Sequence, residues 1–311
     1  MNAHSSQVID WVKGARPRTL PAALVPVMAG SCLAYRYRTG RSLGILGSHN
    51  RPGHDMFELS YCLAALVVSL AMQVGVNYAN DYSDGIKGTD DDRVGPVRLV
   101  GSKLASPRAV KLAALTSFTI GAAVGLVLSI ERAPWLIVVG AASIGAGWFY
   151  TGGKNPYGYR GFGELSVFIF FGLVATCGTQ YVATGHFESV SILVGVTVGL
   201  CSIALLETNN LRDIVGDSQV GKKTLAVRLG DRRTRILFVG TLFWVEISTV
   251  VLSIIMRDAW VLLGLGGAPL AWVAGSRVTS GETGKGLVGV LKLVSMFQVV
   301  CGIGLSLGFL L

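Results

Sequence analysis

Long apolar runs separated by short polar stretches make up most of the chain. A helix needs about 20 apolar residues to cross a bilayer, and nine runs near that length recur along the sequence. Each run is continuously apolar instead of alternating in short pieces, so the runs predict helices and not the strands of a barrel. The predicted spans are residues 19–36, 59–79, 110–130, 134–151, 164–184, 190–208, 234–256, 259–275 and 288–310.

The composition agrees with this pattern. Of the 311 residues, 51% are hydrophobic and 14% are charged, whereas about a quarter of the residues in a soluble domain are charged. Many of the 41 glycines fall inside the spans, and Gly121 with Gly125 and Gly195 with Gly199 are four residues apart. Small residues at this spacing let membrane helices pack closely. We therefore expect one all-α integral membrane domain over residues 1–311, with about nine transmembrane helices.

The distribution of Lys and Arg predicts the orientation in the membrane. If the N-terminus is cytoplasmic, 21 of the 27 basic residues fall in cytoplasmic segments, where basic residues are enriched. Arginines of the first outer loop are the discordant feature. The expected cytoplasmic segments include residues 1–18, 80–109 and 209–233, and the protein is expected in the cell membrane. The net charge of +9 is then explained by orientation and by anionic lipid head groups, and no nucleic-acid partner is expected.

An acidic stretch, "NYANDYSDGIKGTDDD", directly follows the second predicted span at residues 77–92. If the helix continues into it, Asn77 and Asp81 are four residues apart, as are Asn80 and Asp84, and each pair lies on one helix face. Carboxylates this dense repel one another unless a cation lies among them. The stretch lacks the spacing and the final Glu of an EF-hand loop.

The end of the sixth predicted span repeats this arrangement in "ALLETNNLRDIVGD". Asn209, Asp213 and Asp217 follow one another at steps of four residues, and both acidic stretches are predicted on the cytoplasmic side. Carboxylate clusters at a membrane edge are costly and tend to mark functional sites, although a single such stretch is more often a solvated loop end. Two matched rows of oxygen ligands predict a shared Mg²⁺ site.

Basic residues accompany both rows. Lys and Arg side chains bind phosphate oxygens, and a metal with basic side chains stabilises the charge that develops when a pyrophosphate ester ionises. The sequence therefore predicts a site for a pyrophosphate ester. The candidate pyrophosphate-binding residues are Lys87, Arg93, Arg98, Arg212 and Lys222.

Three longer strings carry a family resemblance: "NDYSDGIKGTDDDRVGPVRLV", "YTGGKNPYGYRGFGELSVFIFFG" and "NNLRDIVGDSQVGKKTLAVRLG". They resemble the UbiA superfamily of intramembrane prenyltransferases, and within it the 1,4-dihydroxy-2-naphthoate polyprenyltransferases of menaquinone biosynthesis. The opening "WVKGARPRTLPAALVPVMAG" is similar to that branch as well. The general superfamily pattern places its last Asp where this chain has Gly88. The "GTDDD" run supplies an Asp two residues later, which favours the naphthoate branch.

The resemblance implies a central cavity between transmembrane helices, capped by the two acidic motifs, in which Mg²⁺ holds a polyprenyl pyrophosphate. The implied metal-binding residues are Asn80, Asp81, Asp84, Asp90, Asn209, Asp213 and Asp217, with Asp91 and Asp92 open as alternatives to Asp90. Aromatic residues are expected to shield an allylic carbocation, with Tyr78, Tyr150, Tyr157 and Tyr159 as the candidates. Lys154 or Arg160 is expected to pair with the acceptor carboxylate. The implied reaction prenylates 1,4-dihydroxy-2-naphthoate with loss of CO₂ and pyrophosphate, giving demethylmenaquinone.

Three alternatives remain open on the sequence. Another branch of the superfamily would act on 4-hydroxybenzoate, homogentisate, a chlorophyll precursor or haem. A transporter would also place polar residues at span ends. Transporters are often built from inverted repeats, whereas the two rows are predicted on the same side of the membrane, as in a parallel repeat. A purely structural membrane protein offers no reason for paired acidic rows. The prenyl chain length and the oligomeric state are not predicted.

Overall fold

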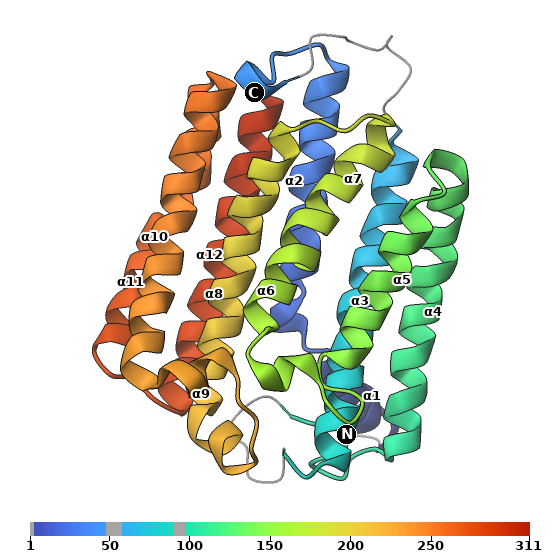
Figure 1. Cartoon of the computed structure of the whole chain (residues 1–311), viewed down its shortest axis with the longest axis vertical. Coiled ribbons are helices and arrows are strands. Elements are labelled where there is room, and N and C mark those ends of the chain that lie inside the picture. Colours follow the sequence, from blue (N-terminus) through green and yellow to red (C-terminus); the bar gives the residue numbers. More distant parts are fainter. Residues whose placement is uncertain (1–2, 48–57, 90–96) are drawn as a thin grey trace.

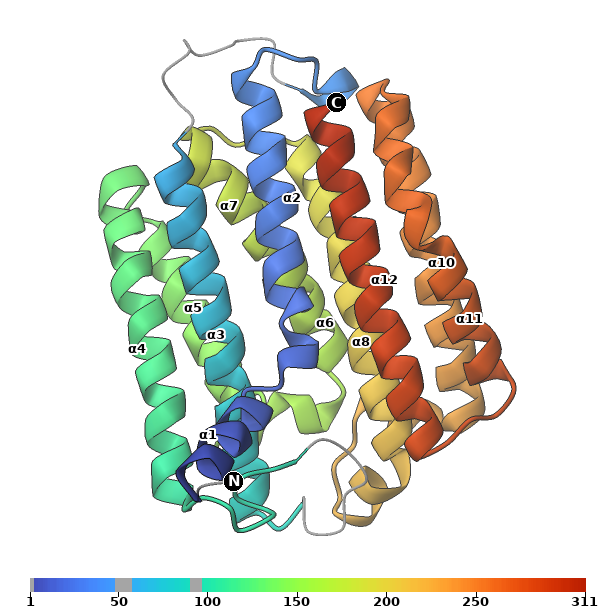
Figure 2. The ribbon, with the colours of Figure 1, turned by 180° about the vertical axis from the view of Figure 1, so that it is seen from behind.

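The structure is a computed structural model that describes residues 3–47, 58–89 and 97–311. Within this part of the chain all regular elements are helical, and the long helices run side by side in one bundle (Figures 1 and 2). The elements are α1 (Ala3–Gly14), η1 (Pro17–Thr19), α2 (Pro21–Arg38), η2 (Gly44–Leu46), α3 (Leu59–Ile86), α4 (Pro107–Arg132), α5 (Leu136–Phe149), η3 (Tyr157–Arg160), α6 (Gly163–Val167), η4 (Phe168–Val174), α7 (Ala175–Thr184), α8 (Val190–Gln219), α9 (Leu225–Leu229), α10 (Asp231–Met256), η5 (Ala259–Gly267), α11 (Ala268–Thr279) and α12 (Lys285–Leu310).

Seven continuous helical segments among the described residues are long and apolar enough to cross a membrane. They are α3, α4, α6 to α7 with the π-helical η4 between them, α8, α10, the 3₁₀ segment η5 with α11, and α12. Helices α2 and α5 run beside these seven in the bundle (Figure 1). The predicted helical membrane architecture is confirmed, and the count of nine crossings stays a prediction.

Helices α3 and α8 both extend beyond the predicted spans. They end at Ile86 and Gln219, so the first residues of both predicted loops are helical. At 1.5 Å per residue, Asn80 and Asn209 each lie about 30 Å along their helices, which is the thickness of the hydrocarbon core of a bilayer. The two acidic rows therefore lie on the last turns of two long helices, at the lower end of the bundle in Figure 1.

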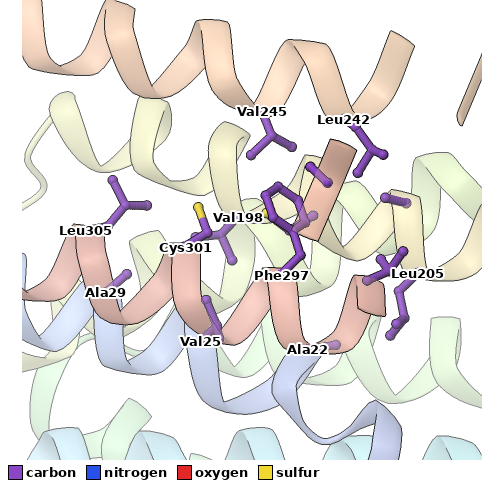
Figure 3. Close-up of a cluster of buried hydrophobic side chains, with 14 of the residues drawn as sticks. Ala22, Val25, Ala29, Val198, Leu205, Leu242, Val245, Phe297, Cys301 and Leu305 are labelled. Carbon is purple, nitrogen blue, oxygen red and sulfur yellow. The ribbon is translucent and has the colours of Figure 1, made fainter. Parts of the chain in front are cut away.

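The larger of two main hydrophobic clusters joins α2, α8, α10 and α12. Figure 3 shows Phe297 and Cys301 of α12 lying among Val25 of α2, Val198 of α8 and Val245 of α10. Close backbone approach adds to this packing, because a Cβ on Gly172 would lie 2.6 Å from the Cα of Gly199. Glycine permits such an approach between membrane helices.

The smaller cluster joins α3 to α4 and to the segment that follows α3. Its buried members are Tyr78, Ala79, Leu99, Val110, Ala114 and Phe118. The two clusters lie on opposite sides of the bundle (Figure 1). A central cavity, in which the site is found, lies between the helices that join them.

Candidate active site

A cavity of about 540 Å³ lies between α2, α3, α4, α5, α6 to α7 and α8. Most of its wall is apolar, with residues such as Val27, Leu136 and Val182. Its polar part includes residues from the ends of α3 and α8. Asn80, Asp84, Asn209 and Asp213 all line this one cavity, so the structure brings members of the two predicted rows together.

The first row is held by groups from the segments that follow α5 and α3. The Asn80 Oδ1 accepts a hydrogen bond of 2.8 Å from the Thr151 hydroxyl. The Asp84 Oδ1 accepts one of 2.8 Å from the Tyr159 hydroxyl, and Asp84 Oδ2 lies 3.6 Å from a guanidinium nitrogen of Arg98. Asp84 is only 2% exposed, so these contacts fix the carboxylate at the cavity wall.

Tyr159 lies between the ends of the two rows. The Lys87 ammonium, which follows α3, lies 4.8 Å from the centre of its ring, and the Lys222 ammonium, which follows α8, lies 5.3 Å from the same centre. Burial raises the pKa of Tyr159, and the Asp84 carboxylate raises it further, so the phenol stays neutral and acts as a donor. Burial lowers the pKa of Lys87, while Asp84 partly offsets this effect.

The second row is held by its own basic neighbours. Arg212 forms two hydrogen bonds of 2.7 and 2.8 Å with the carboxylate oxygens of the adjacent Asp213. Asp217 lies 3.4 Å from the Lys222 ammonium. The Asn209 amide nitrogen donates to the Leu205 carbonyl at 3.1 Å, which leaves its side-chain oxygen for other partners. Asp213 and Asn209 line the cavity, whereas Asp217 does not.

Asp81 is directed away from the cavity. Both of its carboxylate oxygens accept backbone hydrogen bonds, from Leu99 at 2.7 Å and from Val100 at 3.0 Å, and its exposed fraction is 0%. The Asp81 carboxylate thus anchors the segment that follows α3. The corresponding residue of the second row, Asn210, donates to Glu164 at 2.9 Å and anchors the start of α6.

The other predicted residues divide into three groups. Arg98, Lys222 and Tyr150 line the cavity. Lys87 and Arg212 lie beside it, where Lys87 donates to the Thr151 carbonyl. The side chains of Lys154 and Arg160 are exposed and do not line it. Arg93 and Asp90, with Asp91 and Asp92, lie outside the described residues.

The donor set determines which metal chemistry fits. In the described part of the chain, no cluster of three or more His, Cys, Asp or Glu could hold a metal ion. The cavity instead offers the carboxylates of Asp84 and Asp213 and the amide oxygens of Asn80 and Asn209. Mg²⁺ binds one or two carboxylates and takes its other ligands from water and substrate phosphates. These residues therefore fit Mg²⁺ that arrives with a phosphate-bearing substrate.

Some residues of the site were missed by sequence reasoning. Thr151 and Thr19 belong to no sequence motif. Only the structure identifies them, through the hydrogen bonds that they form with Asn80 and Gln73. Gln73 also lines the cavity, and a signal existed for it. Gln73 lies four residues before Asn77, and Asn77 lies four residues before Asp81. This line of polar positions at helical spacing extends from the acidic motif into the apolar span.

Comparison with known proteins identifies the family. The profile described as "UbiA prenyltransferase family" matches residues 51–287. The chain belongs to the UbiA prenyltransferase family. It is 49% identical over 297 residues to a protein of Mycobacterium tuberculosis named 1,4-dihydroxy-2-naphthoate octaprenyltransferase, with 96% of this chain and 95% of that protein covered.

Solved structures of the family share the fold. A UbiA homologue from Aeropyrum pernix, solved without ligand, matches with a TM-score of 0.69 and 14% identity, covering 91% of this chain and 96% of its own. A UbiA homologue from Archaeoglobus fulgidus bound to GPP and Mg²⁺ matches with a TM-score of 0.55 and 13% identity, covering 93% of this chain and 99% of its own. The UbiA fold that the sequence strings predicted is confirmed.

Proposed function

We propose that this UbiA-family member transfers a polyprenyl group from polyprenyl pyrophosphate to 1,4-dihydroxy-2-naphthoate. The observation that carries the proposal is 49% identity over nearly the whole length of a relative named for that activity, together with a cavity that joins a polar end to a long apolar wall. A polyprenyl pyrophosphate has the same division between a charged head and an apolar tail.

The pyrophosphate is proposed to bind at the polar end of the cavity. Asp84 and Asp213, with the oxygens of Asn80 and Asn209, would hold Mg²⁺, which neutralises the charge that develops on the leaving group. Arg98 and Lys222 line the same end and would bind the remaining phosphate oxygens. We leave Asp81 out of the proposed metal ligands, because both of its oxygens already accept backbone hydrogen bonds.

Bond cleavage is proposed to precede attack by the aromatic ring. The bond between the allylic carbon and the pyrophosphate oxygen breaks, and its electron pair leaves with pyrophosphate. The apolar walls exclude water from the resulting cation, and Tyr150 and Tyr157, whose ring centres are 5.6 Å apart, present aromatic surface to it. The ring carbon that bears the carboxylate attacks the cation, and loss of CO₂ restores aromaticity and yields demethylmenaquinol.

The end of the bundle that carries the site is proposed to face the cytoplasm. The predicted cytoplasmic segments, which hold 21 of the 27 Lys and Arg, include the N-terminal residues and the ends of α3 and α8, and these lie at one end of the bundle (Figure 2). The C-terminus lies at the opposite end. Basic residues are enriched on the cytoplasmic side of membrane proteins.

The proposal is tested with purified protein in detergent. The protein is mixed with Mg²⁺, a polyprenyl pyrophosphate and 1,4-dihydroxy-2-naphthoate, and the prenylated, decarboxylated product is followed by mass spectrometry. Product that disappears on chelation of Mg²⁺ is the expected result. Prenylation of 4-hydroxybenzoate or homogentisate, with none of the naphthoate, would contradict the proposed acceptor while keeping the reaction class. No product with any of these acceptors, in folded protein, would contradict prenyl transfer.

A further inference from the structure

A polar patch lies on the cavity wall deeper in the bundle than the metal-binding residues. It consists of Arg16 and Thr19, which lie between α1 and α2, and Gln73 and Asn77 on α3. Asn77 and Gln73 precede Asn80 by three and seven residues, so they lie about 4.5 and 10.5 Å deeper along the helix. Both are buried, with exposed fractions of 3% and 6%, and the metal proposal uses neither of them.

The hydrogen bonds of Thr19 determine how the two amides are oriented. The Thr19 hydroxyl donates to the Arg16 carbonyl at 3.0 Å, so its oxygen is left with acceptor capacity only. It accepts from the Gln73 amide nitrogen at 2.9 Å and from the Asn77 amide nitrogen at 3.1 Å. Asn77 also donates to the Ala15 carbonyl at 2.9 Å, which only an N–H group can do.

Because the amide nitrogens of Gln73 and Asn77 are used in this network, their side-chain oxygens are the groups that can bind a ligand. A hydroxyl has one proton and accepts through its oxygen, so rotating either amide by 180° would place oxygen against oxygen. The nitrogens are therefore fixed on Thr19, and the oxygens of Gln73 and Asn77 are directed away from it. Since both residues line the cavity, these oxygens form a pair of acceptors for a ligand that carries hydroxyl groups.

Arg16 adds a positive charge to the same patch. Its backbone is in the left-handed region, with φ of 54°, a conformation that non-glycine residues adopt at a cost and that tends to persist at functional sites. This conformation turns the chain between α1 and η1. The guanidinium also interacts electrostatically with Asp81, but its five N–H donors allow it to bind a second carboxylate.

We propose that this patch is the acceptor-binding site. The oxygens of Gln73 and Asn77 accept hydrogen bonds from the ring hydroxyls of the naphthoate, and Arg16 binds its carboxylate. The inference rests on the proposed function, and it replaces Lys154 and Arg160, whose side chains are exposed outside the cavity. The patch lies about one to two helical turns from Asn80, so a fused aromatic ring bound there lies next to the allylic carbon of a donor held at the metal site.

The test compares two variants by steady-state kinetics with two competitive inhibitors. Gln73→Leu removes a hydroxyl acceptor, and Arg16→Asn removes the positive charge while keeping a residue that tolerates the left-handed conformation. The inhibitors are 1,4-dihydroxynaphthalene, kept reduced, which has the hydroxyls alone, and 2-naphthoate, which has the carboxylate alone. Gln180→Leu is the control, because Gln180 is a buried glutamine held by Thr184 of α7 and does not line the cavity.

Both variants are expected to raise the KM for the naphthoate about tenfold or more and to leave the KM for polyprenyl pyrophosphate unchanged. Gln73→Leu should weaken inhibition by dihydroxynaphthalene only, and Arg16→Asn inhibition by 2-naphthoate only. Thr19→Val should mimic Gln73→Leu, and Thr19→Ser should restore the wild-type KM. The control should change neither KM.

The outcomes separate this inference from the proposed function. If wild-type protein prenylates the naphthoate but neither variant changes its KM, the acceptor site is wrong and the reaction stands. Equal loss of binding of both inhibitors and of the donor would also contradict the inference, because it would indicate a general structural role. If wild-type protein does not prenylate the naphthoate at all, the proposed function fails and the inference fails with it.

Discussion

The two acidic rows share a spacing and differ in what holds them. On α3, Asp84 contacts Tyr159 and Arg98, groups that come from other segments. On α8, Asp213 is bound at both oxygens by its own sequence neighbour, Arg212. The first row is therefore pre-organised by the surrounding fold. The second carries its own counter-ion, next to it in the sequence.

The residues that follow Asn80 and Asn209 have similar structural roles, although one is an aspartate and the other an asparagine. Asp81 follows Asn80 and anchors the backbone of Leu99 and Val100, while Asn210 follows Asn209 and anchors Glu164 at the start of α6. In both rows one residue lines the cavity and its neighbour holds an adjacent segment in place. Carboxylates of the same motif, such as Asp81 and Asp84, can therefore have different roles.

The largest expected effect is a loss of activity on substitution of Asp84, in contrast to a loss of stability on substitution of Asp81. Asp84→Asn should lower kcat/KM more than ~100-fold, since even groups that only support a metal ligand are worth 10–100-fold. Asp81→Asn should lower the unfolding temperature, because burying an unsatisfied N–H costs about 1–3 kcal/mol. Thermal unfolding and Mg²⁺ titration of activity measure both effects. An Asp81→Asn variant that is stable but needs far more Mg²⁺ would contradict this division.

Removing the hydroxyl that supports the first row should have the next largest effect. Tyr159→Phe deletes the donor to Asp84 and should lower kcat/KM about 10–100-fold, while the ring still contacts the two lysines. Tyr78→Phe is the matched control, because the Tyr78 hydroxyl donates to the Trp11 carbonyl at 2.9 Å instead of to a row residue. Steady-state kinetics of the two variants should differ clearly, and equal losses would show that Asp84 needs no support from Tyr159.

The two arginines test the difference in counter-ions directly. Arg212→Lys loses the two-point contact with Asp213, which lysine cannot reproduce, and should raise the KM for polyprenyl pyrophosphate about tenfold. Arg98→Lys should have a smaller effect on that KM, since the guanidinium of Arg98 lies farther from its carboxylate, at 3.6 Å from Asp84. A larger effect at Arg98 would mean that the first row, not the second, depends on its counter-ion.

The smallest expected effect is a shift in pH dependence. Burial lowers the pKa of Lys87, so the ammonium loses its proton at a lower pH than an ordinary lysine. If the ammonium binds pyrophosphate, kcat/KM for the donor falls as pH rises through this lowered pKa, because kcat/KM reports the ionisation of free enzyme. Lys87→Arg should move this alkaline fall to higher pH. An unchanged profile would exclude Lys87 from pyrophosphate binding.

Much of the fold was predictable because a bilayer imposes simple rules. The span predicted at residues 59–79 is part of α3, which begins at Leu59, and the span at 190–208 is part of α8, which begins at Val190. The pairing of Asn80 with Asp84 followed from helical spacing alone. Polar residues that interrupt an apolar run indicate a site, because each is costly in lipid.

The contacts of the individual site residues were not predictable from the sequence. Asp81 and Asp84 have the same side chain and adjacent helical positions, yet the backbone of Leu99 binds one and Tyr159 the other. Which face meets which segment depends on how the bundle packs. The proposed acceptor patch likewise depends on Thr19 reaching Gln73, 54 positions away. Lys154 was a candidate because the sequence does not show that its side chain is exposed outside the cavity.

The central claim is that the two rows form one metal-dependent pyrophosphate site. Isothermal titration calorimetry with a non-reactive prenyl thiopyrophosphate and Mg²⁺ tests it without catalysis, on wild-type protein and on Asp84→Asn and Asp213→Asn. The account predicts tight binding only with Mg²⁺ in the wild type, and loss of the Mg²⁺-dependent part in both variants. Wild-type binding by either variant would contradict a shared site.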